Sequence, residues 1–277
     1  MKQTKYLVNS QWLAQQINNP QVVIVDCRFK LAEPDWGKQE YDRAHIEGAY
    51  YLSLDRDLSA PVQLRGGRHP LPDLDVFAQK LVQMGIVKNE TLVVAYDDSR
   101  MAFASRLWWL LRYMGHDRVA LLDGGWNDWI KHDYSVTQAI PEPKSGSFIP
   151  RSKSDWLVDI NTVKSAQNKD ETIIVDSRDS DRYAGLNEPI DPIAGSISTA
   201  VNSPWKQTTD EAGYFKPIKV QQQLWDRYQE ADKIIVYCGS GVTACVNLLS
   251  LTVAGFDNIM LYPGGWSDWC SYLDTPQ

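Results

Sequence analysis

An internal repeat constrains the fold of this chain more than any other feature of the sequence. The run Leu121–Trp129 (LLDGGWNDW) returns as Leu261–Trp269 (LYPGGWSDW), and the run Val22–Arg28 (VVIVDCR) returns as Thr172–Arg178 (TIIVDSR). In each half, short β-rich runs alternate with helix-like runs, a pattern typical of an α/β domain with a largely parallel sheet flanked by helices. The repeat therefore predicts two α/β domains in tandem.

The position of the boundary follows from composition. The segment Ile140–Ser147 (IPEPKSGS) is rich in proline and small polar residues, as expected of an exposed linker. With 277 residues and 43% hydrophobic content, the chain can form two cores. We expect domains at 1–144 and 145–277. A duplication can simply enlarge a fold, so function must be sought in the loops.

Charge and cysteine content exclude several classes of protein. The net charge of -7 comes without a basic stripe, which argues against nucleic acid or an anionic membrane as a partner. The N-terminus has no apolar signal region, and no run approaches the ~20 apolar residues of a membrane span. Four cysteines without zinc-ligand spacing predict reduced thiols and no metal site. We expect a soluble cytoplasmic protein.

One cysteine has a setting that predicts reactivity. Cys238 ends the strand-like run that begins at Ile234, and Gly239 and Gly241 lie between it and an apolar helix-like run. Glycines let successive backbone N–H groups turn inward as an anion-binding nest, and the start of the helix adds partial positive charge. A thiol placed there should ionise readily, and the thiolate is the nucleophile.

The alternative for a cysteine after a buried strand is an inert, packed side chain. That alternative is favoured for the other three cysteines. Cys27 has Ser177 as its repeat partner, Cys245 falls two helical turns beyond Cys238, and Cys270 is near the C-terminus. Alignment of the halves on their GGW runs sets Asp98 against Cys238, so only the second half is expected to carry the nucleophile.

Together these motifs make the chain resemble the tandem-domain rhodanese and 3-mercaptopyruvate sulfurtransferase family over nearly its whole length. The resemblance rests on the repeated VD(C/S)R and GGW(N/S)DW runs and on Tyr41–Ala49 (YDRAHIEGA), Gly67–Pro72 (GRHPLP) and Cys238–Thr243 (CGSGVT). It implies two rhodanese-like domains, of which only the second is catalytic. It also implies a sulfurtransferase that carries sulfur as a persulfide on its cysteine, with no cofactor.

The resemblance also implies roles for individual residues. Ser240, His69 and Asp55 match a Ser–His–Asp relay that positions the donor and its protons, although a histidine in Arg-His-Pro can also be an ordinary loop residue. Arg182 matches a donor-binding arginine, and its guanidinium suits a carboxylate; the alternative is a solvated rim residue. The loop residues Gly239, Gly241, Val242 and Thr243 are expected to bind the donor.

The loop also bears on the choice of donor. In the family, CGSGVT loops accompany mercaptopyruvate, whereas thiosulfate enzymes place basic residues after the cysteine, which would favour a dianion. Asp191 departs from the pattern, because it stands where the family carries a second donor-binding arginine. A second departure is Ile193–Ile197 (IAGSI), where many members of the family have Gly-His-Ile. We interpret this segment as a structural turn.

These patterns lead to a hypothesis with rivals. We expect sulfur transfer from a small anionic donor, with 3-mercaptopyruvate favoured, through Cys238 to cyanide, a thiol or a thioredoxin-like protein. Thiosulfate sulfurtransferase activity is the first alternative, and a non-enzymatic persulfide carrier or interaction module is another. A cysteine phosphatase is disfavoured, because Thr243 and Ala244 end the loop where a phosphate-clamping arginine is required.

Overall fold

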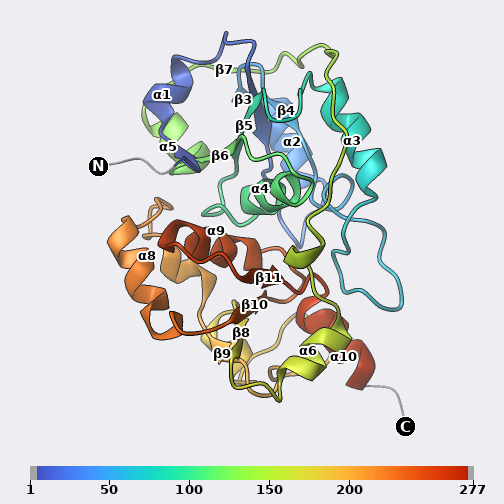
Figure 1. Cartoon of the computed structure of the whole chain (residues 1–277). Helices are drawn as coiled ribbons and strands as arrows, with labels where there is room; N and C mark the ends of the chain where they lie inside the picture. The colour runs from blue at the N-terminus through green and yellow to red at the C-terminus, as the bar shows by residue number, and fades with distance from the viewer. Residues whose placement is uncertain (1–4, 274–277) are drawn as a thin grey trace. The chain divides into compact units, whose positions relative to one another are not determined.

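The computed structural model describes residues 5–273, which form two compact units (Figure 1). Within these residues, unit 1 comprises 5–60, 71–152 and 211–215, and unit 2 comprises 61–70, 153–210 and 216–273. The main division thus follows Ser152, whereas the sequence placed it at residue 145. Each half of the sequence also contributes one short segment to the unit formed mainly by the other half.

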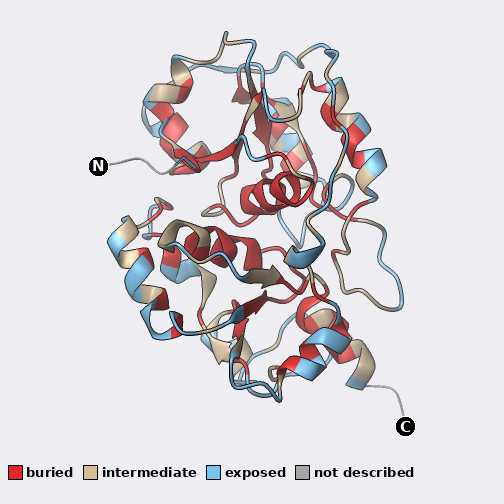
Figure 2. Cartoon of the chain, viewed as in Figure 1, coloured by how far each residue is buried: buried red, intermediate tan, exposed pale blue. Residues whose placement is uncertain are grey.

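Unit 1 is a five-stranded parallel sheet in the order β1-β6-β5-β2-β4. Its strands are β1 Leu7–Val8, β2 Val22–Asp26, β4 Tyr50–Tyr51, β5 Leu92–Tyr96 and β6 Val119–Leu122, and β3 His45–Ile46 pairs antiparallel with β7 Val136–Thr137. The helices are α1 Ser10–Ala14, α2 Trp36–Arg43, α3 Leu74–Gln83, α4 Ala104–Tyr113 and α5 Gly125–Lys131. Every residue of α4 is buried, including Arg106 and Arg112 (Figure 2).

Unit 2 repeats this plan with a four-stranded parallel sheet in the order β11-β10-β8-β9. Its strands are β8 Thr172–Asp176, β9 Val201–Asn202, β10 Lys233–Tyr237 and β11 Ile259–Leu261. The α-helices are α6 Ile160–Ala166, α7 Ser180–Tyr183, α8 Ile218–Trp225, α9 Ala244–Ala254 and α10 Gly265–Leu273, and the short 3-10 helices are η1 Ser154–Trp156, η2 Trp205–Thr208 and η3 Asp226–Tyr228. The predicted fold class, two tandem α/β domains with parallel sheets, is confirmed.

The repeated VD(C/S)R run encodes the same buried ion pair in each unit. Arg28 contacts Asp26 at 2.7 Å, and Arg178 contacts Asp176 at 2.6 Å, with all four side chains almost fully buried. Each guanidinium also stacks on the tryptophan of the GGW run in its own unit, at 4.1 and 4.9 Å from the ring centre. The two repeated motifs therefore pack against each other at the end of the central strands.

The aspartate of each GGW(N/S)DW run, or the residue beside it, holds a segment that comes from the other half of the sequence. In unit 1, Asp128 accepts a hydrogen bond from the hydroxyl of Tyr214. In unit 2, Asp268 accepts the backbone N–H of Gly66 at 2.7 Å, and Ser267 accepts that of Arg68 at 3.1 Å. These bonds fix the segments 211–215 and 61–70 in their units.

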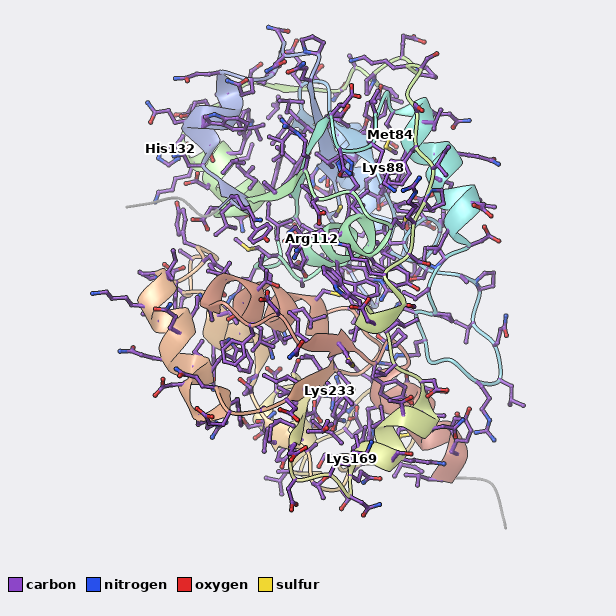
Figure 3. All side chains as sticks on the ribbon, in the orientation of Figure 1. Met84, Lys88, Arg112, His132, Lys169 and Lys233 are labelled. Atoms are coloured by element: carbon purple, nitrogen blue, oxygen red, sulfur yellow. The ribbon has the colours of Figure 1, made fainter. Side chains whose placement is uncertain are left out.

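The proline-rich segment between the halves is mostly exposed, as predicted, but it is bonded to unit 1 along the end of α3. Lys144 donates its backbone N–H to Gln83, and its Cα pairs with Met84 in an isolated parallel bridge. Lys88, which Figure 3 labels with Met84, donates its ammonium to the carbonyl of Ile149 at 2.9 Å. These contacts explain why the main division follows Ser152.

The helix α9 is the most apolar helix of unit 2, and eight of its residues are buried (Figure 2). It has 11 residues, about half the ~20 needed to span a bilayer. No helix within residues 5–273 is long and apolar enough to cross a membrane.

Candidate active site

Cys238 lies in the tight turn between the buried strand β10 and the start of α9 in unit 2. Its carbonyl accepts the N–H of Trp266 at 2.8 Å, and the next carbonyl, of Gly239, accepts that of Ser267 at 2.9 Å. Gly241 has a φ of 71°, and a Cβ there would lie 2.4 Å from the carbonyl oxygen of Pro263. Only glycine fits that position, so the turn has one shape.

The turn presents several backbone N–H groups without protein acceptors. Within the described residues, the N–H groups of Gly239, Ser240, Val242 and Thr243 make no hydrogen bond to the protein, although three of these residues are buried. Buried N–H groups without a partner are rare in folded proteins. These donors, followed directly by the N-terminus of α9, form a site that fits an anion beside Cys238.

The predicted partnership of Ser240 and His69 appears in the geometry. The Ser240 hydroxyl lies 2.7 Å from Nδ1 of His69, and both side chains are buried. His69 belongs to the segment Pro61–Pro70 of unit 2, so the two groups lie in one unit although they are far apart in sequence. Asp55 is exposed in the turn after β4 of unit 1, and its place in the relay stays a prediction.

Two arginines lie over the glycine that follows Cys238. A Cβ on Gly239 would lie 2.9 Å from Nη2 of Arg68 and 3.5 Å from Nη1 of Arg182. Asp191 contacts both guanidinium groups, and Glu188 binds Arg182 at 2.7 Å. Burial and the neighbouring charge of Arg182 lower the pKa of Arg68. The acid that departs from the family pattern is thus paired with cations in the site.

Arg68 was not among the residues singled out from the sequence. It precedes His69 in the Gly67–Pro72 run, and a cation beside a candidate catalytic histidine is the signal that could have indicated it. Nothing local in the sequence shows that this loop belongs to unit 2. The same holds for Glu188, whose carboxylate is almost fully buried between Arg178 and Arg182.

The other three cysteines are packed side chains, as the sequence predicts. Cys27, Cys245 and Cys270 are at most 1% exposed. Burial raises the pKa of Cys27 well above the ordinary value of a thiol, and Asp26 adds to the shift. The Sγ of Cys245 lies 3.4 Å from the carbonyl oxygen of Gly241, and that of Cys270 lies 3.8 Å from the carbonyl oxygen of Ile193.

The sequence alignment of the two halves was wrong by one residue at this loop. The strands β5 and β10 end at Tyr96 and Tyr237, so Asp97 is the residue that follows the first strand as Cys238 follows the second. Trp126 donates its N–H to the carbonyl of Asp97 at 2.9 Å, as Trp266 does to Cys238. The first half has one more residue between the strand and its GGW run, which shifted Asp98 into register.

Asp97 itself binds the backbone of its loop. One carboxylate oxygen accepts the N–H groups of Ser99 and Met101, and the other accepts those of Phe103 and Ala104, at 2.8 to 3.0 Å. Burial nevertheless raises the pKa of Asp97 to about 6. The donors that could bind an anion in unit 1 are therefore used by a side chain of unit 1.

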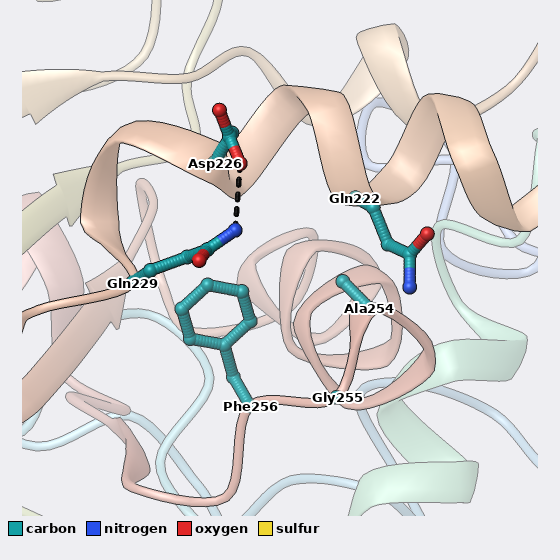
Figure 4. A pocket seen from close by; sticks show the side chains of 6 residues that line it. All are labelled: Gln222, Asp226, Gln229, Ala254, Gly255 and Phe256. Atoms are coloured by element: carbon teal, nitrogen blue, oxygen red, sulfur yellow. Dashed lines mark hydrogen bonds between the residues drawn. The ribbon is translucent and has the colours of Figure 1, made fainter.

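A hollow on unit 2 lies away from this chemistry. It is lined by Gln222, Asp226, Gln229, Ala254, Gly255 and Phe256 (Figure 4). Its acid, Asp226, accepts a hydrogen bond from Gln229 at 2.6 Å, and its lining includes the C-terminal end of α9, whereas Cys238 precedes the N-terminal end. Among residues 5–273, no cluster of histidine, cysteine and acidic side chains could hold a metal.

Comparison with known proteins agrees with the tandem fold. The Rhodanese-like domain model matches residues 9–132 and again 159–272. A probable 3-mercaptopyruvate sulfurtransferase of Pseudomonas aeruginosa is 39% identical over 269 residues, covering 95% of this chain and 94% of that protein. A putative thiosulfate sulfurtransferase of Mycobacterium tuberculosis is 33% identical over 258 residues, covering 92% of this chain and 90% of that protein.

Among solved structures, the rhodanese fold of SseA from Escherichia coli, described as a 3-mercaptopyruvate sulfotransferase, matches with a TM-score of 0.83 at 30% identity. The match covers 95% of this chain and all of that one. The chain therefore belongs to the tandem rhodanese and 3-mercaptopyruvate sulfurtransferase family.

Proposed function

We propose that this protein is a sulfurtransferase in which Cys238 accepts sulfur from a small anionic donor, with 3-mercaptopyruvate favoured, and passes it on as a persulfide. The observation that carries the proposal is the Cys238 turn, where four backbone N–H groups without protein acceptors precede α9. Backbone donors aimed at one point stabilise negative charge on a bound group. The Ser240 hydroxyl, bonded to His69 beside the same turn, adds a proton carrier.

The first step forms a sulfur–sulfur bond. The Cys238 thiolate attacks the terminal sulfur of the donor, the carbon–sulfur bond of mercaptopyruvate breaks, and its electron pair forms the enolate of pyruvate. Cys238 then carries the transferred sulfur as a persulfide. The N–H groups of the turn stabilise the negative charge on the sulfur during this exchange.

The enolate must then gain a proton to leave as pyruvate. The Ser240 hydroxyl, 2.7 Å from Nδ1 of His69, is the group we assign to this transfer, with the imidazole replacing the proton that the hydroxyl gives up. Asp55 remains our candidate for the third member, which would orient the histidine. The loop residues Gly239, Gly241, Val242 and Thr243 are assigned to donor binding.

The second step returns the enzyme to its starting state. A thiophilic acceptor such as cyanide, a small thiol or a thioredoxin-like protein attacks the outer sulfur of the persulfide, and the Cys238 thiolate leaves. Neither step requires a metal or an organic cofactor. We place the reaction in the cytoplasm, where thiols are kept reduced.

Thiosulfate is the second candidate donor, and one observation favours it. The sequence argument against it counted cations within the loop, but Arg68 and Arg182 lie beside Gly239 from outside the loop. Two guanidinium groups suit a dianion. In this variant of the reaction the sulfur–sulfur bond of thiosulfate breaks and sulfite leaves.

Steady-state kinetics with both donors tests the proposal. We expect kcat/KM to be higher for 3-mercaptopyruvate than for thiosulfate, because Ser240 and His69 can protonate an enolate and sulfite needs no such proton. A clear preference for thiosulfate would overturn the donor assignment. Slow turnover with both donors, together with tight binding to a protein partner, would instead support the persulfide carrier.

A further inference from the structure

The backbone around Arg68 is held in place by unit 2. The N–H of Arg68 donates to Ser267, and the N–H of Gly66 donates to Asp268 at 2.7 Å. Gly67 has a φ of 80°, and a Cβ there would lie 2.3 Å from the carbonyl oxygen of Gly264. The direction in which the Arg68 side chain leaves the chain is therefore fixed.

Asp191 connects this side chain to Arg182. One of its oxygens contacts Nη1 of Arg68, and the other accepts Nη2 of Arg182 at 2.9 Å. The Asp191 side chain is only 1% exposed, so its charge is screened little by solvent. A buried carboxylate between two guanidinium groups keeps two like charges close together.

The remaining ends of the two guanidinium groups are directed at one place. Glu188 binds Nε and Nη2 of Arg182. Among the described residues, Nη2 of Arg68 and Nη1 of Arg182 have no hydrogen-bond acceptor. They lie 2.9 and 3.5 Å from the Cβ position of Gly239, and Nη2 of Arg182, which is bonded to the two carboxylates, is also 3.5 Å from it. Both cationic donors thus face the residue that follows the nucleophile.

The family resemblance already assigns Arg182 to donor binding. We propose that Arg68 is a second donor-binding residue, which with Arg182 forms an anion clamp over Gly239 for the charged end of the sulfur donor, and that Asp191 is the positioning residue that holds both arginines. The clamp rests on the proposed function, which places the donor's sulfur at Cys238. Guanidinium groups bind carboxylates and related oxyanions through paired N–H donors. The clamp therefore assigns a negative charge to the end of the donor remote from its sulfur, as in mercaptopyruvate and thiosulfate.

Two alkylating reagents of similar size test the clamp without sulfur chemistry. Iodoacetate carries a carboxylate and iodoacetamide is neutral, so the ratio of their rates at Cys238 measures anion binding next to the thiol. Peptide mass spectrometry separates Cys238 from the other cysteines. We expect Arg68→Gln to lower this ratio at least about tenfold, the size of one charge-assisted hydrogen bond, with little change in the iodoacetamide rate. The KM for mercaptopyruvate should rise by a similar factor.

Matched variants separate charge from folding. Arg227→Gln removes an exposed arginine that stacks on Tyr228 at 4.6 Å, and it should leave both the ratio and the KM unchanged. Arg68→Lys keeps the charge without the paired donors and should give an intermediate ratio. Asp191→Asn should lower the ratio in the same direction as Arg68→Gln, and Asp191→Glu should restore part of it.

The outcomes distinguish the clamp from the proposed function. An unchanged ratio and an unchanged KM in Arg68→Gln would overturn the clamp, while persulfide formation by the unmodified protein would still stand. A lowered ratio in a protein that takes no sulfur from either donor would support the clamp and reject the proposed function. If neither iodoacetate nor iodoacetamide modified Cys238, the result would count against the clamp and against the proposed function.

Discussion

The turns that follow β5 and β10 occupy the same place in two copies of one fold, but they treat their backbone donors differently. In unit 1, the carboxylate of Asp97 accepts four backbone N–H groups of its own loop. In unit 2, Cys238 takes the equivalent position, and four N–H groups of its loop have no acceptor among residues 5–273. The N–H groups of the first loop are bound by a carboxylate of the same loop, whereas those of the second loop are available to an external anion, as we propose.

The comparison shows how two copies of one fold can use the backbone donors of the same loop differently. A buried carboxylate satisfies donors that would otherwise destabilise the unit, since each unpaired buried polar group costs about 1–3 kcal/mol. A cysteine in the same position satisfies none of them, so that cost is offset only when a ligand binds. The Cys238 loop is therefore expected to be the less stable of the two.

The largest effect is expected when the nucleophile is removed. Cys238→Ser should reduce sulfur transfer at least about a thousandfold and leave the fold intact, because a serine hydroxyl near neutral pH is a far weaker nucleophile than a thiolate. Activity assays with mercaptopyruvate and far-ultraviolet circular dichroism measure both effects. Cys270→Ser is the matched control and should retain most activity. Substantial activity in Cys238→Ser would make the two loops equivalent.

The next effect concerns Ser240, which we propose as the proton carrier of the second loop. Ser240→Ala removes the hydroxyl bonded to His69 and should lower kcat for mercaptopyruvate about a hundredfold, the lower range of general acid catalysis. The kcat for thiosulfate should change much less, since no enolate forms. Equal losses with the two donors would mean that Ser240 shapes the loop and does not carry a proton.

A smaller effect is expected from the carboxylate in unit 1. Asp97→Asn leaves one acceptor oxygen for four N–H groups, so the free energy of unfolding should fall by about 1–3 kcal/mol at pH 7. Asp98→Asn is the control, because the neighbouring carboxylate of Asp98 accepts the hydroxyl of Ser99 at 3.1 Å and does not hold the loop as Asp97 does. Urea unfolding of the three proteins measures the difference. Equal stability would show that the Asp97 contacts contribute little.

The difference in stability between the unmodified protein and Asp97→Asn should also depend on pH. Burial raises the pKa of Asp97 to about 6, above the 3.8 of the unfolded chain, so the folded state binds this proton more readily. This proton-linked contribution adds to that of the hydrogen bonds, which remain at pH 7; it is present below about pH 4 and is lost as the pH rises toward 6. The stability advantage of the unmodified protein over Asp97→Asn should therefore shrink between about pH 4 and pH 6. A widening gap would contradict the assigned direction.

The smallest effect is expected for a thiol introduced into unit 1, which should not become a second active site. Asp97→Cys in a Cys238→Ser background places a thiol at the equivalent position, but Asp98 then stands where unit 2 has Gly239. Its negative charge should repel an anionic donor. Mass spectrometry after exposure to mercaptopyruvate should find no sulfur on the introduced thiol. Sulfur at that position would show that a thiol and the loop donors suffice.

Much of the fold was predictable because the repeat is local and periodic. The VD(C/S)R and GGW(N/S)DW runs indicated two parallel α/β sheets, and the turn from Cys238 to Thr243 was correctly placed between a strand and a helix. The pairing of Ser240 with His69 followed from the family resemblance. Its 2.7 Å geometry shows that the resemblance extends to this pair.

What the sequence did not predict depends on contacts between distant segments. The segment 61–70 belongs to unit 2 because its backbone bonds to the GGW(N/S)DW run of that unit, and sequence order gives no sign of such bonds. Arg68 was missed for this reason. Asp191 departs from the family pattern, and the sequence did not predict that its charge is paired with Arg68 and Arg182. One extra residue also misaligned the first loop, which hid the role of Asp97.

The most direct test of the central claim is the intact mass of the unmodified protein after exposure to 3-mercaptopyruvate and, separately, to thiosulfate. The account predicts that the protein gains one sulfur atom, that peptide mapping places it on Cys238, and that cyanide removes it. A protein that gains no sulfur from either donor, or that carries the sulfur on Cys27, Cys245 or Cys270, would contradict the account.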